Sequence, residues 1–286
     1  MTLIDAIQRA HESRHPLIMG VVNVTPDSFS DGGRYLQVDK AVDHGLSLAK
    51  QGADILDIGG ESTRPGADPV DVGMELERVI PVIEGLRRAT TCAISIDTSK
   101  SEVMRAAIAA GANMINDVHG LRSPGALEAA AALGVPVCLM HMQAEPKTMQ
   151  EDPNYRDVVA EVSRFLAQRV QSCLAVGMRR DQLVIDPGFG FGKTLDHNLA
   201  LLNGIRTLRE SGVPVLAGLS RKSMLAAITG RSSTDMRLAS SLAAALLAAQ
   251  RGAAILRVHD VAETLDVLRV WAAARSLDGD PVQAVE

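Results

Sequence analysis

The stretch Gln182-Leu183-Val184-Ile185-Asp186-Pro187-Gly188-Phe189-Gly190-Phe191-Gly192-Lys193 decides the fold. It starts with a short apolar run, Leu183 to Ile185. A run this short, with β-branched residues and followed by Pro and Gly, is typical of a buried strand. An unpaired carboxylate at the end of a buried strand is unfavourable, so Asp186 is expected to meet a ligand there. The alternating glycines allow backbone to approach that ligand closely.

Seven other short apolar runs also end in polar residues, and each is separated from the next by room for a helix. They are Leu17 to Val22, Ala53 to Ile58, Cys92 to Ile96, Met114 to Ile115, Val135 to Met140, Val213 to Leu219 and Ala253 to Leu256. Strict alternation of strand and helix predicts parallel strands with right-handed crossovers. Eight such units predict a single (β/α)8 TIM barrel over residues 1–286, with its core at about 17–276. The alternative is an open doubly wound sheet, but polar loops follow every run and not only those at a switch point.

Helical spacing and turn residues predict the segments between the strands. They are a short cap from Thr2 to Arg14, then Lys40 to Gln51, Met74 to Arg88, Ser99 to Ala110, Pro124 to Leu133 with Ser123 as N-cap, a long helix ending near Gly177, Asn198 to Ser211, Met236 to Arg251 and Val261 to Arg275. The tail from Asp278 to Glu286 is expected to fray. The Met236 to Arg251 helix is apolar on more than one side, through Leu238, Leu242, Ala245, Ala249 and Leu247, which predicts a homodimer interface.

Composition narrows the class of partner. A net charge of -5, only 2% aromatic residues and no basic run argue against a nucleic-acid partner. The longest apolar stretch, Leu238 to Ala249, falls short of the roughly 20 residues that span a membrane, and no signal peptide precedes the first strand. The three cysteines are scattered without a CxxC motif. We therefore expect reduced thiols and a cytoplasmic location.

Polar residues at three strand ends point to a binding site. Asp97, Asn116 and Asp186 each follow a different apolar run. In a barrel these ends converge on one face, where active sites form. Acceptors plus one amide donor suit a neutral, donor-rich heterocycle better than a phosphate. Helix N-capping is the competing interpretation, and it is the favoured one for Asp117.

Basic residues follow strands two, seven and eight and predict an anion site: Arg64, Arg221, Lys222, Arg257 and His259. Surface ion pairing is the alternative, and it suits Arg257 least because that residue lies inside a strand. A Schiff-base role for Lys222 is a minority interpretation, since nothing in the sequence desolvates it. Residues 188–194 match neither a P-loop nor a dinucleotide fingerprint.

Histidine and apolar residues near the predicted mouth have weaker assignments. His141 and His259 lack companions at ligand spacing, which argues against a zinc site. His119 and His197 are expected at the rim of the core or in solvent. Met140 and Phe191 either sandwich a flat ring or line the barrel.

The motifs together resemble dihydropteroate synthases. They are Asn-Val-Thr-Pro-Asp-Ser-Phe-Ser-Asp-Gly-Gly at 23–33, Asp-Ile-Gly-Gly-Glu-Ser-Thr-Arg-Pro-Gly at 57–66, Asp-Thr at 97–98, Ile-Asn-Asp at 115–117, Asp-Pro-Gly-Phe-Gly-Phe-Gly-Lys at 186–193, Ser-Arg-Lys-Ser at 220–223 and Arg-Val-His-Asp at 257–260. The likeness runs in order from about Leu17 to Trp271. The first two motifs together are highly specific.

The resemblance implies a reaction and its substrates. The amine of 4-aminobenzoate attacks the methylene of 6-hydroxymethyl-7,8-dihydropterin diphosphate, diphosphate leaves, and 7,8-dihydropteroate forms on the folate pathway, with Mg²⁺ as cofactor. Carried over by position, Asn23 binds the metal. Asp97, Asn116, Asp186 and Lys222 hold the pterin, Thr63, Pro65, Ser220 and Lys222 frame 4-aminobenzoate, and Arg64, Arg257 and His259 take the diphosphate. Asp97, Lys222, Arg257 and His259 would be the catalytic groups.

Two other interpretations stay open. A pterin barrel of the methyltransferase type would need neither Arg257 and His259 for diphosphate nor the motif at 23–33. A non-catalytic paralogue that only binds pterin predicts broken loop motifs, and none is broken here.

Overall fold

The predicted strands form one parallel sheet that curls into a barrel. The computed structural model describes residues 1–25, 34–62, 66–143, 149 and 153–277. The eight strands follow the order β6-β5-β4-β3-β2-β1-β8-β7, and a bridge between Ile185 and Val215 brings the two ends together. Their bounds are β1 Leu17–Asn23, β2 Ile55–Gly59, β3 Ala93–Asp97, β4 Met114–Asp117, β5 Val137–Met140, β6 Leu183–Asp186, β7 Leu216–Ala217 and β8 Ile255–Val258. The (β/α)8 prediction is confirmed, and the open doubly wound alternative is wrong.

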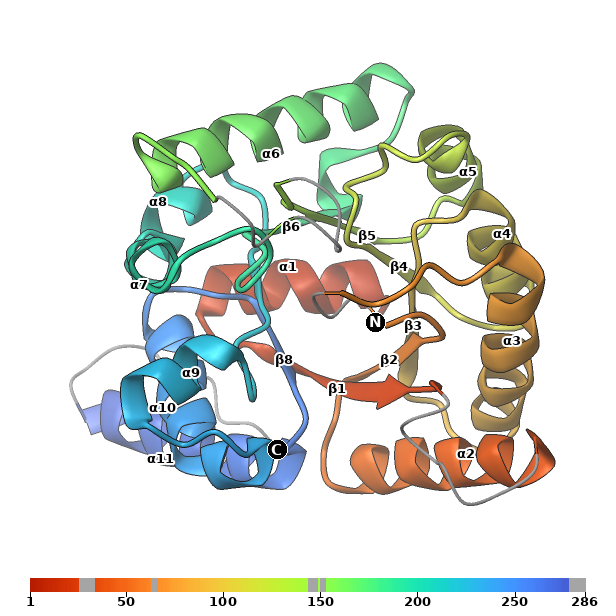
Figure 1. Ribbon diagram of the computed structural model, residues 1–286, viewed down its shortest axis with the longest axis horizontal. Coiled ribbons are helices and arrows are strands. Elements are labelled where there is room, and N and C mark those ends of the chain that lie inside the picture. The colour runs from red at the N-terminus through yellow and green to blue at the C-terminus, as the bar shows by residue number, and fades with distance from the viewer. Residues whose placement is uncertain (26–33, 63–65, 144–148, 150–152, 278–286) are drawn as a thin grey trace.

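Helices surround the strands in chain order, as Figure 1 shows looking into the ring. They are α1 Leu3–Ser13, α2 Arg34–Lys50, α3 Val72–Ala89, α4 Ser101–Ala109, α5 Ala126–Leu133, α6 Val158–Ala175, α7 Leu195–Asn203, α8 Ile205–Arg209, α9 Ser223–Thr229, α10 Leu238–Gln250 and α11 Val261–Leu277, with short 3-10 turns η2 Arg180–Gln182 and η3 Thr234–Arg237. In the described part of the chain, no helix has the length and apolar character needed to cross a membrane.

Side chains alternate between the two faces of each strand, and this alternation builds two separate cores. Residues of one parity, such as Ile18, Leu56 and Ile94, pack outward under the helices. The other parity points into the barrel. There Met19, Ile55, Met114, Cys138, Val184, Leu216 and Ile255 form a small apolar cluster with Ile7 of α1. The predicted N-terminal helix therefore closes one end of the barrel, and α1 lies across the ring in Figure 1.

The inner face changes from apolar to polar along the strands. Two residues beyond the apolar layer, on the same inward parity, come Asp57, Asn116, Asp186 and Arg257. The pairing register puts Asp97 beside Asn116 and Gly59. All these positions lie toward the carboxyl ends of the strands, the face on which barrel active sites form. The fold thus gathers the predicted strand-end groups into one place.

Several element boundaries differ from the predictions. The helix expected to start at Pro124 starts at Ala126, because Gly125 occupies the N-cap in a left-handed conformation and Ser123 does not cap it. The helix expected from Asn198 to Ser211 breaks at Gly204, where an added Cβ would meet Val159 at 2.8 Å. The short α9 was not predicted, and α2 starts six residues earlier than the expected Lys40.

Candidate active site at the carboxyl ends of the strands

A buried ion-pair network joins three strands at the centre of the site. Arg257 of β8 donates from Nε to Asp57 Oδ2 at 2.6 Å and from Nη2 to Asp97 Oδ2 at 2.9 Å. Asn116 Nδ2 donates to the same Asp57 oxygen at 3.1 Å. Asp57 is fully buried, and its Oδ1 has no hydrogen-bond partner among the described residues. The network places two carboxylates around one guanidinium, so it is net negative when both carboxylates are ionised.

The environment shifts the pKa values of this network. Burial raises the pKa of Asp97 to about 7, although Arg257 opposes the shift. Burial acts to lower the pKa of Arg257, but Asp57 and Asp97 outweigh it and the net shift is upward. Arg257 therefore stays charged, and Asp97 titrates near neutral pH. Perturbed groups in one cleft are typical of a functional site.

Asp57 was missed at the sequence level. It stands in the middle of the apolar run from Ala53 to Ile58, where a charge is out of place. It shares the inward parity of Arg257, which places both side chains inside the barrel but does not by itself pair them. From the sequence, Arg257 is expected at an anion site. In the structure its Nε and Nη2 are already occupied by carboxylates.

Asp186 ends β6 as predicted and is almost fully buried. Its Oδ1 accepts the backbone N–H of Gly188 at 2.7 Å. Burial raises its pKa, against the opposing effect of that hydrogen bond and of Lys222. Gly188 has φ +70, and a Cβ there would lie 1.9 Å from the His141 carbonyl oxygen, so this turn requires glycine.

The side chains of Lys222 and Phe191 are in direct contact beside the strand ends. The Lys222 Nζ lies 4.2 Å from the centroid of the Phe191 ring, and its chain runs past Gly190. Burial, assisted by Arg257, lowers the pKa of Lys222 to about 8. The expectation that nothing desolvates Lys222 is therefore wrong. The cause lies in the fold, because the Gly188–Gly192 turn covers a lysine that is far away in the sequence.

An apolar wall lies beside these polar groups. Met140 and Phe191 belong to one buried cluster with Val118, Met142 and Met149. Lys193 is also buried there: its Nζ donates to the Phe191 carbonyl at 2.9 Å and lies 3.0 Å from His141 Nδ1. Burial lowers the pKa of Lys193 to about 7 and that of His141 to about 3. These contacts of Lys193 connect His141, which follows β5, to the Gly188–Gly192 turn, and they were not predicted.

The groups after β7 and β8 divide into two sets. Ser220 Oγ lies 3.0 Å from His259 Nδ1, and burial lowers the pKa of His259 to about 4, so the imidazole is neutral at pH 7. Arg221 pairs with Asp260, with Nη2 and Oδ1 at 2.5 Å. The prediction that Arg221 joins the anion site is thus not supported by its geometry. Lys222, Arg257 and His259 remain close to one another at the barrel mouth, where Arg257 and Lys222 both act on the pKa of His259.

Other predicted residues fall at the edges or outside the described chain. Thr63, Arg64 and Pro65 lie outside the described residues, as does much of the 23–33 motif. Asp117 does not cap a helix. Its carboxylate accepts Ser99 Oγ and the N–H groups of His119 and Leu121, and so fixes the loop after β4. His119 Nδ1 lies 3.1 Å from Ser123 Oγ.

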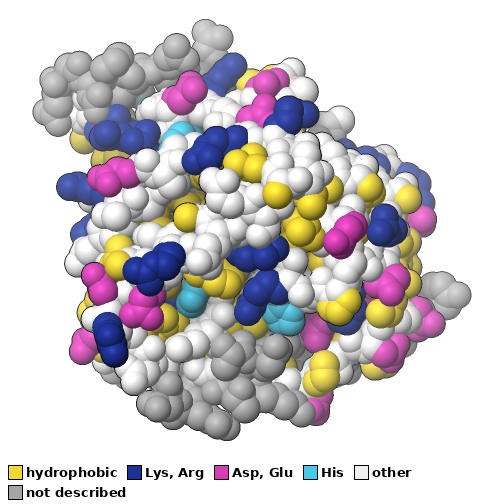
Figure 2. Space-filling view, turned by 90° about the horizontal axis from the view of Figure 1, so that it is seen from above, with side chains coloured by type: hydrophobic (Ala, Val, Ile, Leu, Met, Phe, Trp, Pro, Cys, Tyr) yellow, Lys and Arg dark blue, Asp and Glu magenta, His cyan; other side chains and the backbone are white. Residues whose placement is uncertain are grey.

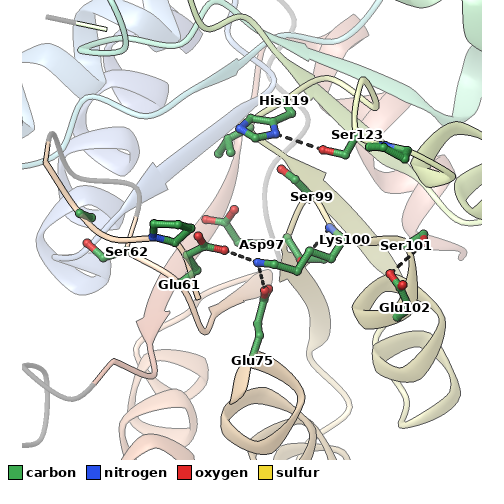
Figure 3. A pocket seen from close by; sticks show the side chains of 15 residues that line it. Glu61, Ser62, Glu75, Asp97, Ser99, Lys100, Ser101, Glu102, His119 and Ser123 are labelled. Carbon is green, nitrogen blue, oxygen red and sulfur yellow. Dashed lines mark hydrogen bonds and ion pairs between the residues drawn. The ribbon is translucent and has the colours of Figure 1, made fainter. Parts of the chain in front are cut away.

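A cavity of about 500 Å³ opens beside Asp97 (Figure 3). It is bordered by the start of the β2–α3 connection, by the loop after β3 and by the loop after β4, with Glu61, Glu75, Lys100, Glu102 and His119 among its lining residues. In Figure 3 the Lys100 side chain lies between Glu61 and Glu75, and Asp97 lies next to Glu61. This cavity and the ion-pair network therefore share one wall.

Asn23 ends β1 and fits a magnesium ligand only in part. An ideal Cβ on Gly59 would lie 3.8 Å from Asn23 Oδ1 and 3.7 Å from Asp97 Oδ2, so both oxygens border the same space. The described residues contain no group of three or more His, Cys, Asp or Glu that could hold a metal. Mg²⁺ typically takes one or two protein oxygens and completes its shell with water and substrate phosphates. Asn23 Oδ1 fits that mode as a single protein ligand, whereas Asp97 Oδ2 already accepts a hydrogen bond from Arg257.

Comparison with known proteins gives one consistent family. Residues 19–259 match the model of the pterin binding enzymes. The chain is 51% identical over 258 residues to the dihydropteroate synthase of Haemophilus influenzae, covering 90% of this chain and 94% of that one. Two structures of Xanthomonas albilineans dihydropteroate synthase also match. The one with 4-aminobenzoic acid has a TM-score of 0.87 at 59% identity, covering 91% and 93% of the two chains. The one with 7,8-dihydropteroate has 0.83 at 56%, covering 91% and 94%.

Proposed function

The chain belongs to the pterin-binding enzymes and, among them, to the dihydropteroate synthases, and from this premise we propose how its residues divide the work. It condenses 4-aminobenzoate with (7,8-dihydropterin-6-yl)methyl diphosphate, releases diphosphate and forms 7,8-dihydropteroate. The observation that supports this most is the polar inner layer of the barrel. It combines buried acceptors for a heterocycle with cations beside them.

The pterin ring is held by Asp97, Asn116, Asp186 and Lys222. A pterin edge carries a guanidine-like set of N–H donors, which a carboxylate can accept in pairs. Asp186 is suited to this because Gly188 occupies only one lone pair of Oδ1. Phe191 and Met140 supply apolar contact for the flat ring.

The diphosphate is bound by Arg257, His259 and Arg64. Lys222 follows β7 and His259 follows β8, while Arg257 lies within β8 and points into the barrel. His259 is neutral in the free protein, so it first contributes a hydrogen bond. A bound dianion would raise its pKa again by direct charge attraction. Asn23 would hold Mg²⁺ through its amide oxygen. When bound, Mg²⁺ supplies positive charge next to the leaving diphosphate.

The amine of 4-aminobenzoate needs no strong base, because an aromatic amine is uncharged at neutral pH. The difficult part of the reaction is the departure of diphosphate. Asp57, Asp97 and Asp186 together with Arg257 and Lys222 give these five groups a net charge of about -1 when all are ionised. That charge stabilises positive charge at the pterin methylene. A dissociative path, in which the C–O bond breaks first, follows from this arrangement.

The second substrate is framed by Thr63, Pro65, Ser220 and Lys222. Ser220 is buried against His259, so its position is fixed before any ligand binds. Thr63 and Pro65 come from the β2–α3 connection. The pocket for 4-aminobenzoate is thus divided between a strand end and a loop, whereas the pterin pocket comes from strand ends and the glycine turn.

We propose a homodimer that buries α9, α10 and α11. Ile228, Met236, Leu238, Leu247 and Val270 are the exposed large apolar side chains of this region. α10 contacts α9, η3 and α11, and exposed apolar side chains on neighbouring elements are typical of an interface. Sedimentation should give a dimer at micromolar concentration, and a monomer would contradict it.

We propose that the protein is cytoplasmic and does not bind nucleic acid, and two observations support this. The three cysteines are free thiols, as reduced compartments favour. The net charge is -5, and the face in Figure 2 carries Asp and Glu side chains as well as Lys and Arg.

Diphosphate release by the purified protein tests the function. We expect release that depends on both substrates, and a product with the mass of dihydropteroate. Lys222→Ala should stay folded and lose most of this turnover. A protein that binds the pterin diphosphate but releases no diphosphate with 4-aminobenzoate would support the storage paralogue instead.

A further inference from the structure

Lys100 joins two acidic side chains from different parts of the fold. It precedes α4, three residues after Asp97, and its side chain is about one-fifth exposed. Its Nζ contacts both Glu61 Oε2 and Glu75 Oε2 (Figure 3). Glu75 lies in the first turn of α3 and is fully buried. We call these three residues the Glu61–Lys100–Glu75 cluster.

Glu61 connects the two ends of the β2–α3 connection. It follows β2 directly after Gly60, and its Oε1 accepts the backbone N–H of Val70 at 3.2 Å. The Gly60 carbonyl accepts Arg78 Nη1 at 2.7 Å. One carboxylate therefore holds residue 61 and residue 70 together and ties both to Lys100. The ten residues of this segment include 63–65, to which the proposed function assigns 4-aminobenzoate and diphosphate contacts.

The start of this segment packs closely against α3. An added Cβ on Gly60 would meet Val79 Cγ1 at 2.7 Å and Glu75 Cγ at 3.1 Å. On the other side, Gly59 is in register with Asp97. The cluster is thus fixed to the same strand ends that carry the pterin-binding groups. A shift of Glu61 would move the connection relative to that site.

The three residues of the cluster differ in how much the burial of charge depends on each of them. Burial acts to lower the pKa of Lys100, but its hydrogen bonds to Glu61 and Glu75 outweigh this, and the net pKa is raised. Lys100 is therefore charged at neutral pH. Glu75 Oε1 has no partner among the described residues, so Lys100 is the counter-charge on which burial of Glu75 depends. Loss of Glu61 leaves a balanced buried pair, whereas loss of Lys100 leaves an unpaired buried carboxylate.

We propose that the Glu61–Lys100–Glu75 cluster is a positioning device for the 4-aminobenzoate pocket. It fixes Glu61 and Val70, which flank the β2–α3 connection, relative to the strand ends that carry the pterin-binding groups. Lys100 and Glu61 touch neither substrate in this assignment. They control the affinity for the second substrate through the loop. The inference rests on the proposed function and deepens it.

The decisive variant is Glu61→Gln. An amide cannot accept from both Lys100 and Val70, because one of its two terminal atoms is itself a donor. We expect the KM for 4-aminobenzoate to rise about tenfold or more, which corresponds to about 1.4 kcal/mol. The KM for the pterin diphosphate should change less than about twofold, since its strand-end site is intact. Hydrogen exchange at the Val70 amide should become faster in the same variant.

Lys100 supplies the companion test and its rescue. Lys100→Met should raise the KM for 4-aminobenzoate, and Lys100→Arg should restore it, because a guanidinium can reach both carboxylates. If Lys100→Met does not fold, the double variant Lys100→Met with Glu75→Gln removes the unpaired buried charge and takes its place. Glu102→Gln is the matched control. It removes a carboxylate from the same cavity, but its side chain contacts Ser101 and not Lys100.

The outcomes separate this inference from the function itself. A parent enzyme that makes dihydropteroate, with KM for 4-aminobenzoate unchanged in Glu61→Gln and Lys100→Met, overturns the positioning role alone. Equal increases in both KM values also overturn it, because they indicate general damage to the barrel mouth. A parent enzyme that makes no dihydropteroate refutes the proposed function.

Discussion

Replacing Asp186 by Asn should strongly weaken or nearly abolish pterin binding without weakening the fold. The backbone N–H of Gly188 lies 2.7 Å from Asp186 Oδ1. This donor fixes how the amide is placed, since its carbonyl oxygen must face Gly188. The NH₂ group is then directed to the position of Oδ2. A donor there meets the N–H donors of the pterin edge, where the carboxylate offered an acceptor.

The size of the effect follows from unpaired donors. Each buried donor left without a partner is unfavourable by about 1–3 kcal/mol, so two of them give roughly 2–6 kcal/mol. This corresponds to a Kd that rises roughly 30-fold to more than 10,000-fold. Calorimetric titration with the pterin diphosphate measures it. The exposed Asp196→Asn, at the first turn of α7, is the control.

The free energy of unfolding of Asp186→Asn should rise or stay unchanged, although the variant binds the pterin more weakly. Burial raises the pKa of Asp186 in the folded protein. The folded state therefore favours the protonated form, and this stabilising contribution is lost as pH rises through the folded pKa. At neutral pH an uncharged amide avoids that loss and still accepts from Gly188. A Kd within a few-fold of the parent, or a variant that unfolds, would refute the assignment of Asp186 to the pterin.

Further predictions concern protonation, covalent chemistry and coupling. The kcat/KM for the pterin diphosphate should be bell-shaped, rising as Asp97 ionises near pH 7 and falling as Lys222 loses its proton near pH 8. Asp97→Asn should lose the acidic limb, and a limb that persists would point to another group. Borohydride with substrates should leave no adduct on Lys222, and mass spectrometry that finds one would indicate Schiff-base chemistry. Finally, 4-aminobenzoate should bind more tightly when Mg²⁺ and diphosphate are present, by about 1–3 kcal/mol. This gain should shrink in Arg64→Ala or with a chelator, and equal affinities in both titrations would show a preformed pocket.

The barrel was predictable because its signals are local and repeated. Each apolar run ends in a polar residue at the carboxyl end of a strand, and Asp97, Asn116 and Asp186 were found by that rule alone. The two-residue period further explains why Ile55 and Ile255 belong to the apolar floor while Asp57 and Arg257 belong to the site.

Long-range contacts explain what the sequence analysis missed. Asp57 and Arg257 are 200 positions apart, and only closure of the barrel between β1, β2 and β8 brings them together. Burial of Lys222 depends on the turn around Phe191. At Gly204, between α7 and α8, the chain passes too close to Val159 of α6 to carry a side chain. None of these has a signature within its own stretch of sequence.

The dissociative path carries the central claim, that the strand ends stabilise both the pterin cation and the leaving diphosphate. It can be tested with pterin diphosphate that carries ¹⁸O in the bridge between the methylene and the first phosphorus. The enzyme is incubated with Mg²⁺ but without 4-aminobenzoate, and the recovered substrate is examined by ³¹P NMR. We predict that ¹⁸O moves from the bridge to the non-bridging positions, because the C–O bond breaks and re-forms while diphosphate stays bound. Label that remains in the bridge, in an enzyme that turns over once 4-aminobenzoate is added, would contradict the account.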